Sequence, residues 1–514
     1  MSFTFLQLIE NQVAEQPESP AIQSADTSYS YQQIWGEVTR LRTLLRSMSV
    51  RRVALALSNC PAWIALDLAA AMERIILVPV PHFFSATQVQ HLMKDAQIGH
   101  VISEARSTIK ENGTGGTGIK HQSGEALRIL GTDLLINALD PDKTEGLKSD
   151  NTEPEAESDD ILKISYTSGT TGDPKGVLIS RLVVDRTVRS LLQAMDATAA
   201  SRHLSVLPYS LLLENVVGIY AVLASGGCCV VPDFASLGIS GSSKVDWHKF
   251  SAVVSFTRPS SMITVPALLQ GLMFCVEHLA LDTSSLQFIA VGGAPVSKNV
   301  LDRAQQLGLP VFQGYGMTEC GSVVCLNLPA NNQPGSVGKP LSHISIRIDQ
   351  QGEIIIKGAN FNGYTKQDVH IPENEWATGD LGYFDDLGFL YVTARKSSAY
   401  STAYGRNVAP EWVESELDSE AVIAQSAVFG EGQKHNISVL VPVVPEIDNA
   451  QLALSVEKAN QRLPDYAQIG AWARAQSAFG LSNGQQSPAG ALRREQIYSD
   501  YRDTIEQLFT EKQA

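Results

Sequence analysis

Short apolar runs recur along the chain and alternate with longer segments of helical periodicity. Residues 53–56, 75–78 and 206–207 are runs of strand length. Strands that alternate with helices form a sheet with helices on its faces, so the pattern predicts a mixed α/β fold. Residues 1–10 are amphipathic and predict a helix; they lack the basic start of a signal peptide.

Two polar stretches interrupt this alternation. Residues 105–127 are rich in Gly and Thr, and residues 138–160 are polar and charged, with an acidic run at 153–160. Such composition is typical of loops and linkers. We therefore predict a mobile surface loop at the first stretch and a linker at the second.

A glycine- and hydroxyl-rich loop follows the second stretch. Residues 166–176 have the sequence YTSGTTGDPKG and lie between two apolar runs at 161–164 and 177–179. Backbone N–H groups, hydroxyls and an ammonium can together cradle a polyphosphate. The lysine stands three residues after Gly172, and two predicted strands flank the loop, so the spacing and context of a Walker loop do not fit. A flexible linker is the alternative, but linkers rarely lie between two apolar strands.

Composition and charge narrow the class of protein. The chain has 514 residues and a formal net charge of −15, which argues against a nucleic-acid-binding surface. The most apolar segment, residues 62–80, contains Asp67, Glu73 and Arg74, so it does not predict a membrane span. Six scattered cysteines have neither metal-site nor disulfide spacing. We expect a cytoplasmic protein without a transmembrane segment.

The loop at 166–176 resembles the phosphate-binding signature of the adenylate-forming (AMP-binding) superfamily, which includes acyl-CoA synthetases, luciferase and the adenylation domains of peptide synthetases. Further segments match that family in its own order. They are GGAP at 292–295, GYGMTECG at 314–321, WATGDLG at 376–382, TARK at 393–396 and GRNVAPE at 405–411. The apolar runs at 288–291 and 311–312, which precede the first two segments, predict strands. Several matches in order over some two hundred and fifty residues are far more specific than any one of them.

The resemblance implies a fold and a division of the chain. The length exceeds one ordinary core, so more than one domain is expected. By resemblance, residues 1–394 form a large N-terminal α/β domain of several subdomains, which binds the nucleotide. Residues 395–514 form a small, mobile α+β lid that rotates between two half-reactions.

The resemblance also assigns roles to residues. Lys175, Thr318, Glu319 and Arg395 are the candidate catalytic residues: Lys175 holds the β- and γ-phosphates, Thr318 contacts the α-phosphate, Glu319 binds Mg²⁺, and Arg395 contacts ribose or phosphate as the lid closes. A carboxylate is a suitable ligand for that hard cation. Asp380 accepts the ribose hydroxyls. The remaining nucleotide-binding candidates are Thr167, Ser168, Gly169, Thr170, Thr171, Gly172, Gly293, Ala294, Pro295, Tyr315 and Gly316.

The implied activity is ATP-dependent conversion of a carboxylic acid to an acyl-adenylate, followed by transfer to a thiol acceptor. ATP and Mg²⁺ are the expected cofactors, and CoA or the phosphopantetheine of an acyl-carrier protein is the expected acceptor. Residues 207–215, LPYSLLLEN, occupy the place of the family segment that gates the acid pocket. Because this segment is leucine-rich, we predict a fatty or other apolar acid and a long-chain acyl-CoA synthetase-like ligase.

The chain departs from the family where an adenylating lysine is usual. Residues 487–494 have the sequence SPAGALRR, and Ala491 stands at the lysine position. The hinge also has Ser397 in place of a charged residue. Three alternatives remain: an enzyme that uses another cation, such as Arg493 or Lys396, or adenylates slowly; an enzyme that turns the same adenylate into another product, such as a lactone; and a nucleotide- or acyl-binding protein with little turnover.

Overall fold

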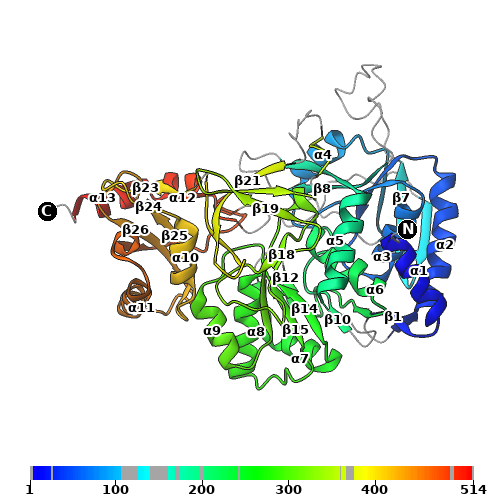
Figure 1. Cartoon of the computed structure of the whole chain (residues 1–514), viewed down its shortest axis with the longest axis horizontal. Coiled ribbons are helices and arrows are strands. Elements are labelled where there is room, and N and C mark those ends of the chain that lie inside the picture. The colour runs from blue at the N-terminus through cyan, green and yellow to red at the C-terminus, as the bar shows by residue number, and fades with distance from the viewer. Residues whose placement is uncertain are drawn as a thin grey trace, which may run out of the picture.

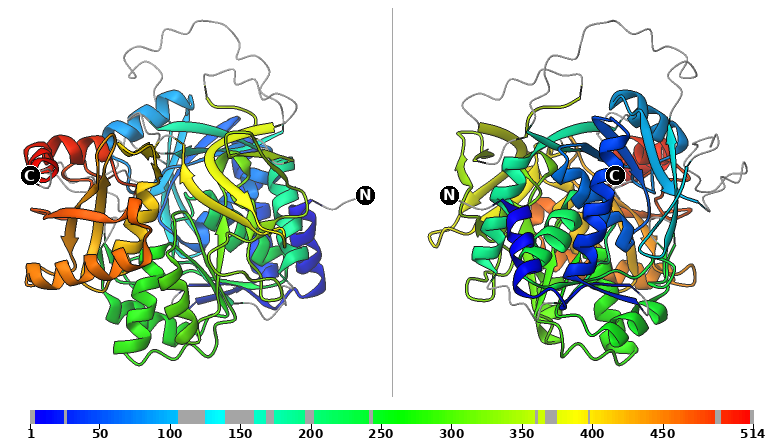
Figure 2. Two further views of the ribbon diagram at one scale, coloured as in Figure 1. Left: turned by 60° about the vertical axis from the view of Figure 1, so that its left-hand side comes forward. Right: turned by 90° about the vertical axis from the view of Figure 1, so that its right-hand side faces the viewer.

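A computed structural model of the protein describes residues 4–24, 27–105, 125–138, 160–167, 174–195, 202–240, 244–358, 361–365, 375–396, 398–486 and 491–511. The N-terminal elements lie at one end of the long axis and the C-terminal elements at the other (Figure 1), as the left view of Figure 2 also shows. Sheets with helices on their faces make up the structure, as the alternating sequence pattern predicts.

A seven-stranded sheet occupies the N-terminal part, with the order β6-β7-β5-β3-β4-β8-β9. Its four central strands are parallel, and antiparallel strands complete both edges. The strands are β3 (Arg52–Ala56), β4 (Ile76–Pro79), β5 (His100–Glu104), β6 (Glu125–Ile129), β7 (Thr132–Ala138), β8 (Ile161–Thr167) and β9 (Lys175–Ser180). The apolar runs of the central strands follow from burial on both faces.

A nine-stranded sheet lies beside it, with the order β18-β17-β16-β15-β14-β10-β11-β1-β2. Six neighbouring strands from β16 to β1 run parallel. The strands are β1 (Pro20–Ser24), β2 (Thr27–Ser30), β10 (Arg202–Leu204), β11 (Cys228–Val230), β14 (Ser261–Thr264), β15 (Phe288–Val291), β16 (Val311–Tyr315), β17 (Cys325–Leu326) and β18 (Lys339–Pro340). The carboxyl ends of β14, β15 and β16 therefore meet at one edge.

Helix α3 (Pro61–Met72) joins the two sheets. All of its residues except Met72 are buried, and it contacts β4 of one sheet and β1 of the other. A helix that is apolar on all sides needs such a central place. One hydrophobic core therefore runs through both sheets, with contributions from α1 (Phe5–Glu15), α2 (Tyr31–Ser47) and α5 (Arg181–Ala194).

A buried polar cluster crosses this core. The Lys163 Nζ atom of β8 donates to Asp67 Oδ1 of α3 at 3.0 Å, to Tyr220 Oη at 2.9 Å and to Asn215 Oδ1. Asp67 Oδ2 also accepts from Asn215 Nδ2 at 2.8 Å and from the Tyr220 hydroxyl. Each of the three protons of the ammonium has a partner. We call these four residues the core cluster.

Asn215 and Tyr220 belong to an unusual helix. Residues Glu214–Ala221 form a π-helix, η2, in which every residue is buried, and α6 (Val222–Ala224) continues it. A π-helix places one more residue in each turn than an α-helix does, and such turns are frequent at functional sites.

The C-terminal part has its own sheet and cores. A four-stranded antiparallel sheet precedes it: β19 (Ser345–Ile348), β20 (Glu353–Lys357), β21 (Glu375–Phe384) and β22 (Leu390–Arg395). Beyond it, β25 (Ile423–Phe429), β26 (Asn436–Pro442) and β27 (Ile469–Arg474) form a three-stranded sheet. One hydrophobic cluster packs on each face of that sheet, with α10 (Pro410–Asp418) and α11 (Asn449–Arg462) on one side and α12 (Arg494–Asp500) and α13 (Arg502–Glu511) on the other.

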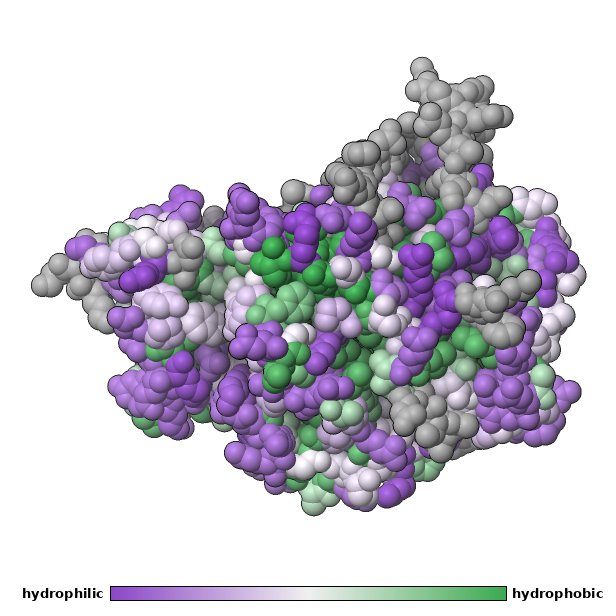
Figure 3. Space-filling model, in the orientation of Figure 1, coloured by the Kyte–Doolittle hydropathy of each residue, from purple (hydrophilic) through white to green (hydrophobic). Residues whose placement is uncertain are grey.

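The remaining elements connect these layers. They are α4 (Ala86–Asp95), α7 (Trp247–Thr257), α8 (Pro266–His278), α9 (Lys298–Gln306), the 3₁₀ turns η3 (Thr318–Cys320) and η5 (Asp465–Ala467), and the short strands β12 (Ile239–Ser240), β13 (Lys244–Val245), β23 (Tyr400–Ser401) and β24 (Asn407–Val408). Hydrophilic residues cover much of the face in Figure 3. Across the described ranges, no helix combines the length and apolarity needed to cross a bilayer.

Most of the predicted strands are present, with one error. Residues 53–56, 75–78, 288–291 and 311–312 fall on β3, β4, β15 and β16 within one residue at their starts. Residues 206–207 were expected in a strand, but β10 ends at Leu204, where its ladders with β11 and β14 stop. Most of the loop and linker predicted at 105–127 and 138–160 lies outside the described residues.

Candidate nucleotide site

The carboxyl ends of two parallel strands carry the glycine-rich segments. Gly293, Ala294 and Pro295 follow β15 and are exposed, and Tyr315 ends β16 next to it. Tyr315 is followed by Gly316, where a Cβ atom would lie 1.7 Å from the carbonyl oxygen of Ser322. No other residue fits that close approach. The glycine lets the chain fold back and start η3, which carries Thr318 and Glu319.

Glu319 faces the end of the predicted phosphate loop. Its Oε1 atom accepts a hydrogen bond of 2.9 Å from the Tyr364 hydroxyl, and the Nζ atom of Lys175 lies 5.8 Å from the centre of the Tyr364 ring. Thr167 and Lys175 are paired across the β8–β9 hairpin. The structure thus brings Lys175 and Glu319 to the two sides of one tyrosine. Ser168, Gly169, Thr170, Thr171 and Gly172 lie outside the described residues.

Tyr364 is a member of the site that the sequence analysis did not identify. Residues 361–365 run beside β9: the Leu178 amide donates to the Gly363 carbonyl at 3.0 Å, and the Thr365 amide donates to Gly176 at 2.9 Å. The Phe361 amide donates to the Glu319 carbonyl at 2.8 Å. The sequence gives little sign of this role, because the pairing joins segments almost two hundred residues apart.

Asp380 is held by two side chains at the same edge of the sheet. The Tyr315 hydroxyl donates to its Oδ2 atom at 2.6 Å, and Arg395 Nη1 donates to its Oδ1 atom at 2.9 Å. Asp380 and Arg395 are partners in the β21–β22 ladder. We call Asp380, Tyr315 and Arg395 the site cluster. A carboxylate offers about four lone-pair sites, so Asp380 can still accept two hydrogen bonds from a ligand.

Burial shifts the acidity of this cluster. Asp380 is only 5% exposed, and this burial raises its pKa above the ordinary value, while the bonds from Arg395 and Tyr315 act in the opposite direction. Burial and the neighbouring carboxylate also raise the pKa of the Tyr315 hydroxyl, so it remains a donor. The Arg395 side chain is 52% exposed, so water reaches one side of the cluster.

The basic side chains near position 491 and at the hinge have different surroundings. Lys396 Nζ donates to Glu353 Oε2 at 2.8 Å, on the four-stranded sheet. Arg494 is bound by Glu411 at 2.8 Å and by Glu414. Arg493 and Ala491 are exposed in the loop before α12. Ser397 and residues 487–490 lie outside the described residues.

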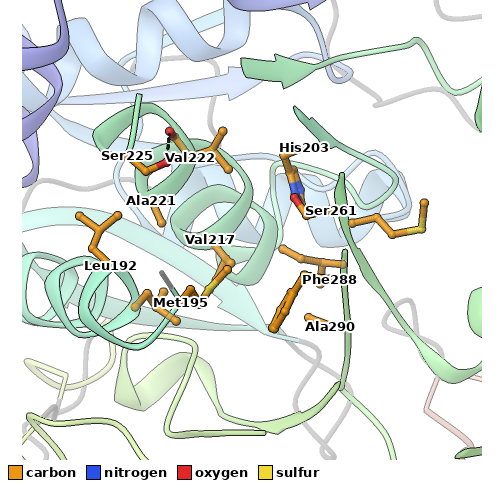
Figure 4. A pocket seen from close by; sticks show the side chains of 13 residues that line it. Leu192, Met195, His203, Val217, Ala221, Val222, Ser225, Ser261, Phe288 and Ala290 are labelled. Atoms are coloured by element: carbon orange, nitrogen blue, oxygen red, sulfur yellow. Dashed lines mark hydrogen bonds between the residues drawn. The ribbon is translucent and has the colours of Figure 1, made fainter. Parts of the chain in front are cut away.

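An apolar pocket opens between α5, η2 and strands β14 and β15. Its lining includes Met195, Val217, Ile263, Phe288 and Ala290, and the cavity measures about 40 Å³ (Figure 4). Phe288 and Ala290 lie on the same face of β15, because side chains alternate along a strand. Gly292 follows them on that face at the nucleotide edge, about 13 Å from Phe288 at 3.3 Å per residue.

Three polar side chains also line this pocket: His203, Ser225 and Ser261. His203 Nδ1 lies 3.1 Å from the Ser261 hydroxyl, and His203 Nε2 lies 3.0 Å from Glu214 Oε1. Figure 4 shows the His203 ring and Ser261 side by side at one edge. Gly218 of η2 makes room for this contact: a Cβ atom there would lie 2.4 Å from Glu214 Oε1 and 2.8 Å from His203 Nε2. Neither His203 nor Glu214 was among the predicted site residues.

The cysteines take no part in the site. All six are free, and Cys320 inside η3 is fully buried, which raises the pKa of its thiol. The described residues contain no cluster of His, Cys, Asp and Glu that could hold a metal by itself. A single carboxylate such as Glu319 could contribute to a cation held mainly by nucleotide phosphates.

Comparison with known families gives two matches that together cover most of the chain. The model of the AMP-binding enzymes matches residues 9–365, and the model of an AMP-binding enzyme C-terminal domain matches residues 400–513.

Curated relatives are ligases of two kinds. A 2-succinylbenzoate–CoA ligase of Bacillus cereus is 33% identical over 297 residues, which are 53% of this chain and 57% of that protein. The matched region thus spans little more than half the length of this relative. A 2-succinylbenzoate–CoA ligase of Bacillus licheniformis is 28% identical over 442 residues, 81% of this chain and 85% of that protein. A long-chain-fatty-acid–CoA ligase of Mycobacterium bovis is 28% identical, covering 75% of this chain and 71% of its own.

Solved structures share the fold at low identity. An anthranilate CoA ligase in complex with anthranoyl-AMP superposes with a TM-score of 0.77 at 14% identity, covering 97% of both chains. The O-succinylbenzoate CoA synthetase of Bacillus subtilis, in complex with ATP and magnesium, gives 0.72 at 22% identity, covering 95% of this chain and 98% of its own. The predicted arrangement, a large α/β part followed by a small C-terminal part, is confirmed by these neighbours.

Proposed function

The chain belongs to the family of AMP-binding enzymes, and from this premise we propose that it joins a carboxylic acid to CoA through an acyl-adenylate, with ATP as the energy source. The observation that supports this most is the convergence of Lys175, Glu319 and the site cluster at one edge of the sheet. A cation, a metal-binding carboxylate and a sugar-binding carboxylate are what adenylate transfer needs around ATP.

We assign binding of the ATP phosphates and of Mg²⁺ to the β8–β9 hairpin and η3. We assign Lys175 to the β- and γ-phosphates, together with Thr167 and residues 168–172. Thr318 contacts the α-phosphate, and Glu319 binds the Mg²⁺ that accompanies ATP. The Tyr364 hydroxyl fixes Glu319 Oε1, and Oε2 is the oxygen that we assign to the metal. Mg²⁺, when bound, neutralises the charge that develops on the leaving pyrophosphate.

We assign binding of the adenosine to the site cluster and to residues 293–295 beside it. Gly293, Ala294 and Pro295 form an exposed surface for the adenine, and Tyr315 and Gly316 lie at the end of the neighbouring strand β16. Asp380 accepts the ribose hydroxyls with its remaining lone pairs. Arg395 stands one strand away and contacts ribose or phosphate.

The acid enters the apolar pocket, in our proposal, with its carboxylate at the nucleotide edge. An apolar wall of Val217, Phe288 and Ala290 suits a hydrocarbon or aromatic acid better than a charged one. The fatty acid predicted from the leucine-rich segment stays a prediction, since the relatives act on 2-succinylbenzoate as well as on long-chain acids. CoA is the acceptor that the relatives' names support, and a carrier protein is the alternative.

We propose the division at residues 394 and 395 as the boundary of a moving lid. The C-terminal part has its own cores, and its links to the large part include bonds from Gln270 Nε2 to the Asp418 carbonyl at 3.2 Å and from Asn299 Nδ2 to Ser419 Oγ at 3.2 Å. Arg395 and Lys396 add the bonds to Asp380 and Glu353 across the same boundary. Each polar contact of this kind is individually weak enough to break during a rotation.

A homologue with little turnover is the second candidate, and Ala491 favours it. No ammonium can reach the carboxylate from that position, and Arg494 is held by Glu411 and Glu414. Pyrophosphate exchange with ATP, measured over a panel of aliphatic and aromatic acids, decides between them. Exchange with any acid supports adenylation; exchange with none contradicts the proposed enzyme. Products formed with CoA, with a carrier protein and with neither then separate thioester from lactone formation.

A further inference from the structure

The polar end of the apolar pocket is unexplained by a simple hydrocarbon substrate. His203 is 3% exposed, Glu214 is fully buried, and both lie among aliphatic side chains of β10, η2 and β14. Burying such groups is costly unless they are hydrogen-bonded. The described residues provide no hydrogen-bond partner for Glu214 Oε2. A buried carboxylate oxygen without a partner points to a missing donor.

The hydrogen-bond chain determines what kind of group is missing. We assign the directions in this chain from one pair of states, a carboxylate at Glu214 and an imidazole with a single N–H at His203. In that arrangement Glu214 Oε1 accepts from His203 Nε2, and His203 Nδ1 accepts the Ser261 hydroxyl proton. Ser261 lines the pocket and has given its only proton away. Its free lone pairs call for a donor on the ligand, whereas Glu214 does not line the pocket and acts through His203.

The local backbone is arranged to form this chain. His203 and Ser261 are direct neighbours on the parallel strands β10 and β14. The π-helix presents Glu214 to His203, and Gly218 leaves the space between them open. Three separate elements thus converge on one polar spot.

Resting on the proposed function, we propose that His203, Glu214 and Ser261 determine specificity for an acid whose far end carries a hydroxyl or another hydrogen-bond donor. The spot lies near Phe288, about 13 Å along β15 from the nucleotide edge. The cavity has room for only a few water molecules, so it holds the end of the tail and not the whole acid. A terminal carbonyl or carboxylate lacks the donor and would be disfavoured.

The test compares octanoic acid, 8-hydroxyoctanoic acid and 8-oxooctanoic acid in pyrophosphate exchange. The hydroxy acid should have a kcat/KM at least about fivefold above the other two, the worth of one hydrogen bond. In Ser261→Ala the ratio of kcat/KM for the hydroxy acid to that for the other acids should fall towards one, because only the reaction of the hydroxy acid becomes slower. Glu214→Gln should reduce it as well if it folds.

Ser190→Ala is the matched control. Ser190 is buried on α5, and its hydroxyl lies 2.7 Å from Nδ1 of another histidine, His343, outside the pocket. The Ser190→Ala variant also loses one serine hydroxyl, and its preference for the hydroxy acid should stay unchanged. A parent protein that favours octanoic or 8-oxooctanoic acid would overturn the proposal, and so would a Ser261→Ala variant that keeps the parent's preference.

Failure of the proposed function is recognisable separately. If no acid supports exchange, the proposed activity is contradicted. The same three acids are then compared by calorimetric titration without ATP. Tighter binding of 8-hydroxyoctanoic acid to the parent, lost in Ser261→Ala, would still support donor recognition. Equal affinities, or no binding of any of the three acids, would overturn it.

Discussion

The core cluster and the site cluster are built from the same parts with different outcomes. In each, a buried aspartate accepts hydrogen bonds from a tyrosine hydroxyl and from a cation. Asp67 and Lys163 are each 1% exposed, whereas Arg395 is 52% exposed beside Asp380. In the core cluster the protein itself supplies every partner of the lysine. In the site cluster lone pairs and an open side remain, which is what a binding site requires.

The sharpest way to break this comparison is to remove the cation from the core. Lys163→Met should lower the free energy of unfolding by about 3–5 kcal/mol, because Asp67 is left as an uncompensated buried charge. Urea denaturation followed by circular dichroism measures it. Asp67→Asn in the same background should restore part of the loss. A loss below about 1 kcal/mol would mean that the core cluster is not a coupled unit.

Position 491 carries alanine where the family resemblance predicts a lysine, and supplying that cation should have the next largest effect. A transition-state contact of this kind is worth about 3–4 kcal/mol, or a few hundred-fold in rate. Ala491→Lys should therefore speed pyrophosphate exchange strongly, while conversion of a supplied acyl-adenylate to thioester stays the same. Ala491→Gln, of similar length but uncharged, is the control. An Ala491→Lys protein that folds and gains nothing would show that Arg493 or another cation already serves.

A second lysine tests the open side directly. Lys175→Met should leave the free energy of unfolding unchanged, because Lys175 is exposed. At subsaturating ATP the exchange rate should fall roughly ten- to hundredfold, since a charge-assisted contact is worth about 1.5–3 kcal/mol. Lys298→Met, an exposed lysine on α9, should change neither quantity. Full activity of Lys175→Met would remove Lys175 from the phosphate site.

The two tyrosines give a matched pair of smaller changes. Tyr220→Phe leaves buried lone pairs of Asp67 without a donor and should cost about 1–3 kcal/mol of unfolding free energy. Tyr315→Phe should cost less than about 1 kcal/mol, because water can replace the hydroxyl on the open side. Denaturation midpoints of both variants under one set of conditions provide the measurement. Equal losses would contradict the distinction between the clusters.

The smallest effect is a shift with pH. Burial raises the pKa of Asp380, and Arg395 opposes that rise. If the ionised carboxylate binds ribose, the KM for ATP should fall as pH rises through this pKa and then level off. Arg395→Met should move the step to higher pH. The free energy of unfolding should change in the opposite sense to ATP binding. Because the pKa of Asp380 is raised in the folded state, this group stabilises the protein at pH values below its unfolded pKa. That stabilisation is lost as the pH rises through the folded-state pKa. A KM step at the same pH in both proteins would exclude the Arg395 coupling.

The parts of the site that consist of consecutive residues could be predicted from the sequence. Strands β8, β9, β15 and β16 could be predicted because each is an apolar run next to a glycine-rich segment. Residues 206–207 were misassigned because apolar character alone does not distinguish a strand from a buried loop. Tyr364 and the His203–Glu214 contact depend on pairing between distant segments and on a π-turn, which no local pattern encodes. The bonds from Tyr315 and Arg395 to Asp380 likewise exist only in the folded sheet.

Gly218 shows how a residue with no side chain can restrict the evolution of a pocket. Replacing it with alanine places a methyl group 2.4 Å from Glu214 Oε1 and 2.8 Å from His203 Nε2, so these side-chain ends must move. Any larger residue at this position therefore requires Glu214 or His203 to leave the present contact. The identity of a residue outside the pocket lining is thus tied to the polar spot inside it.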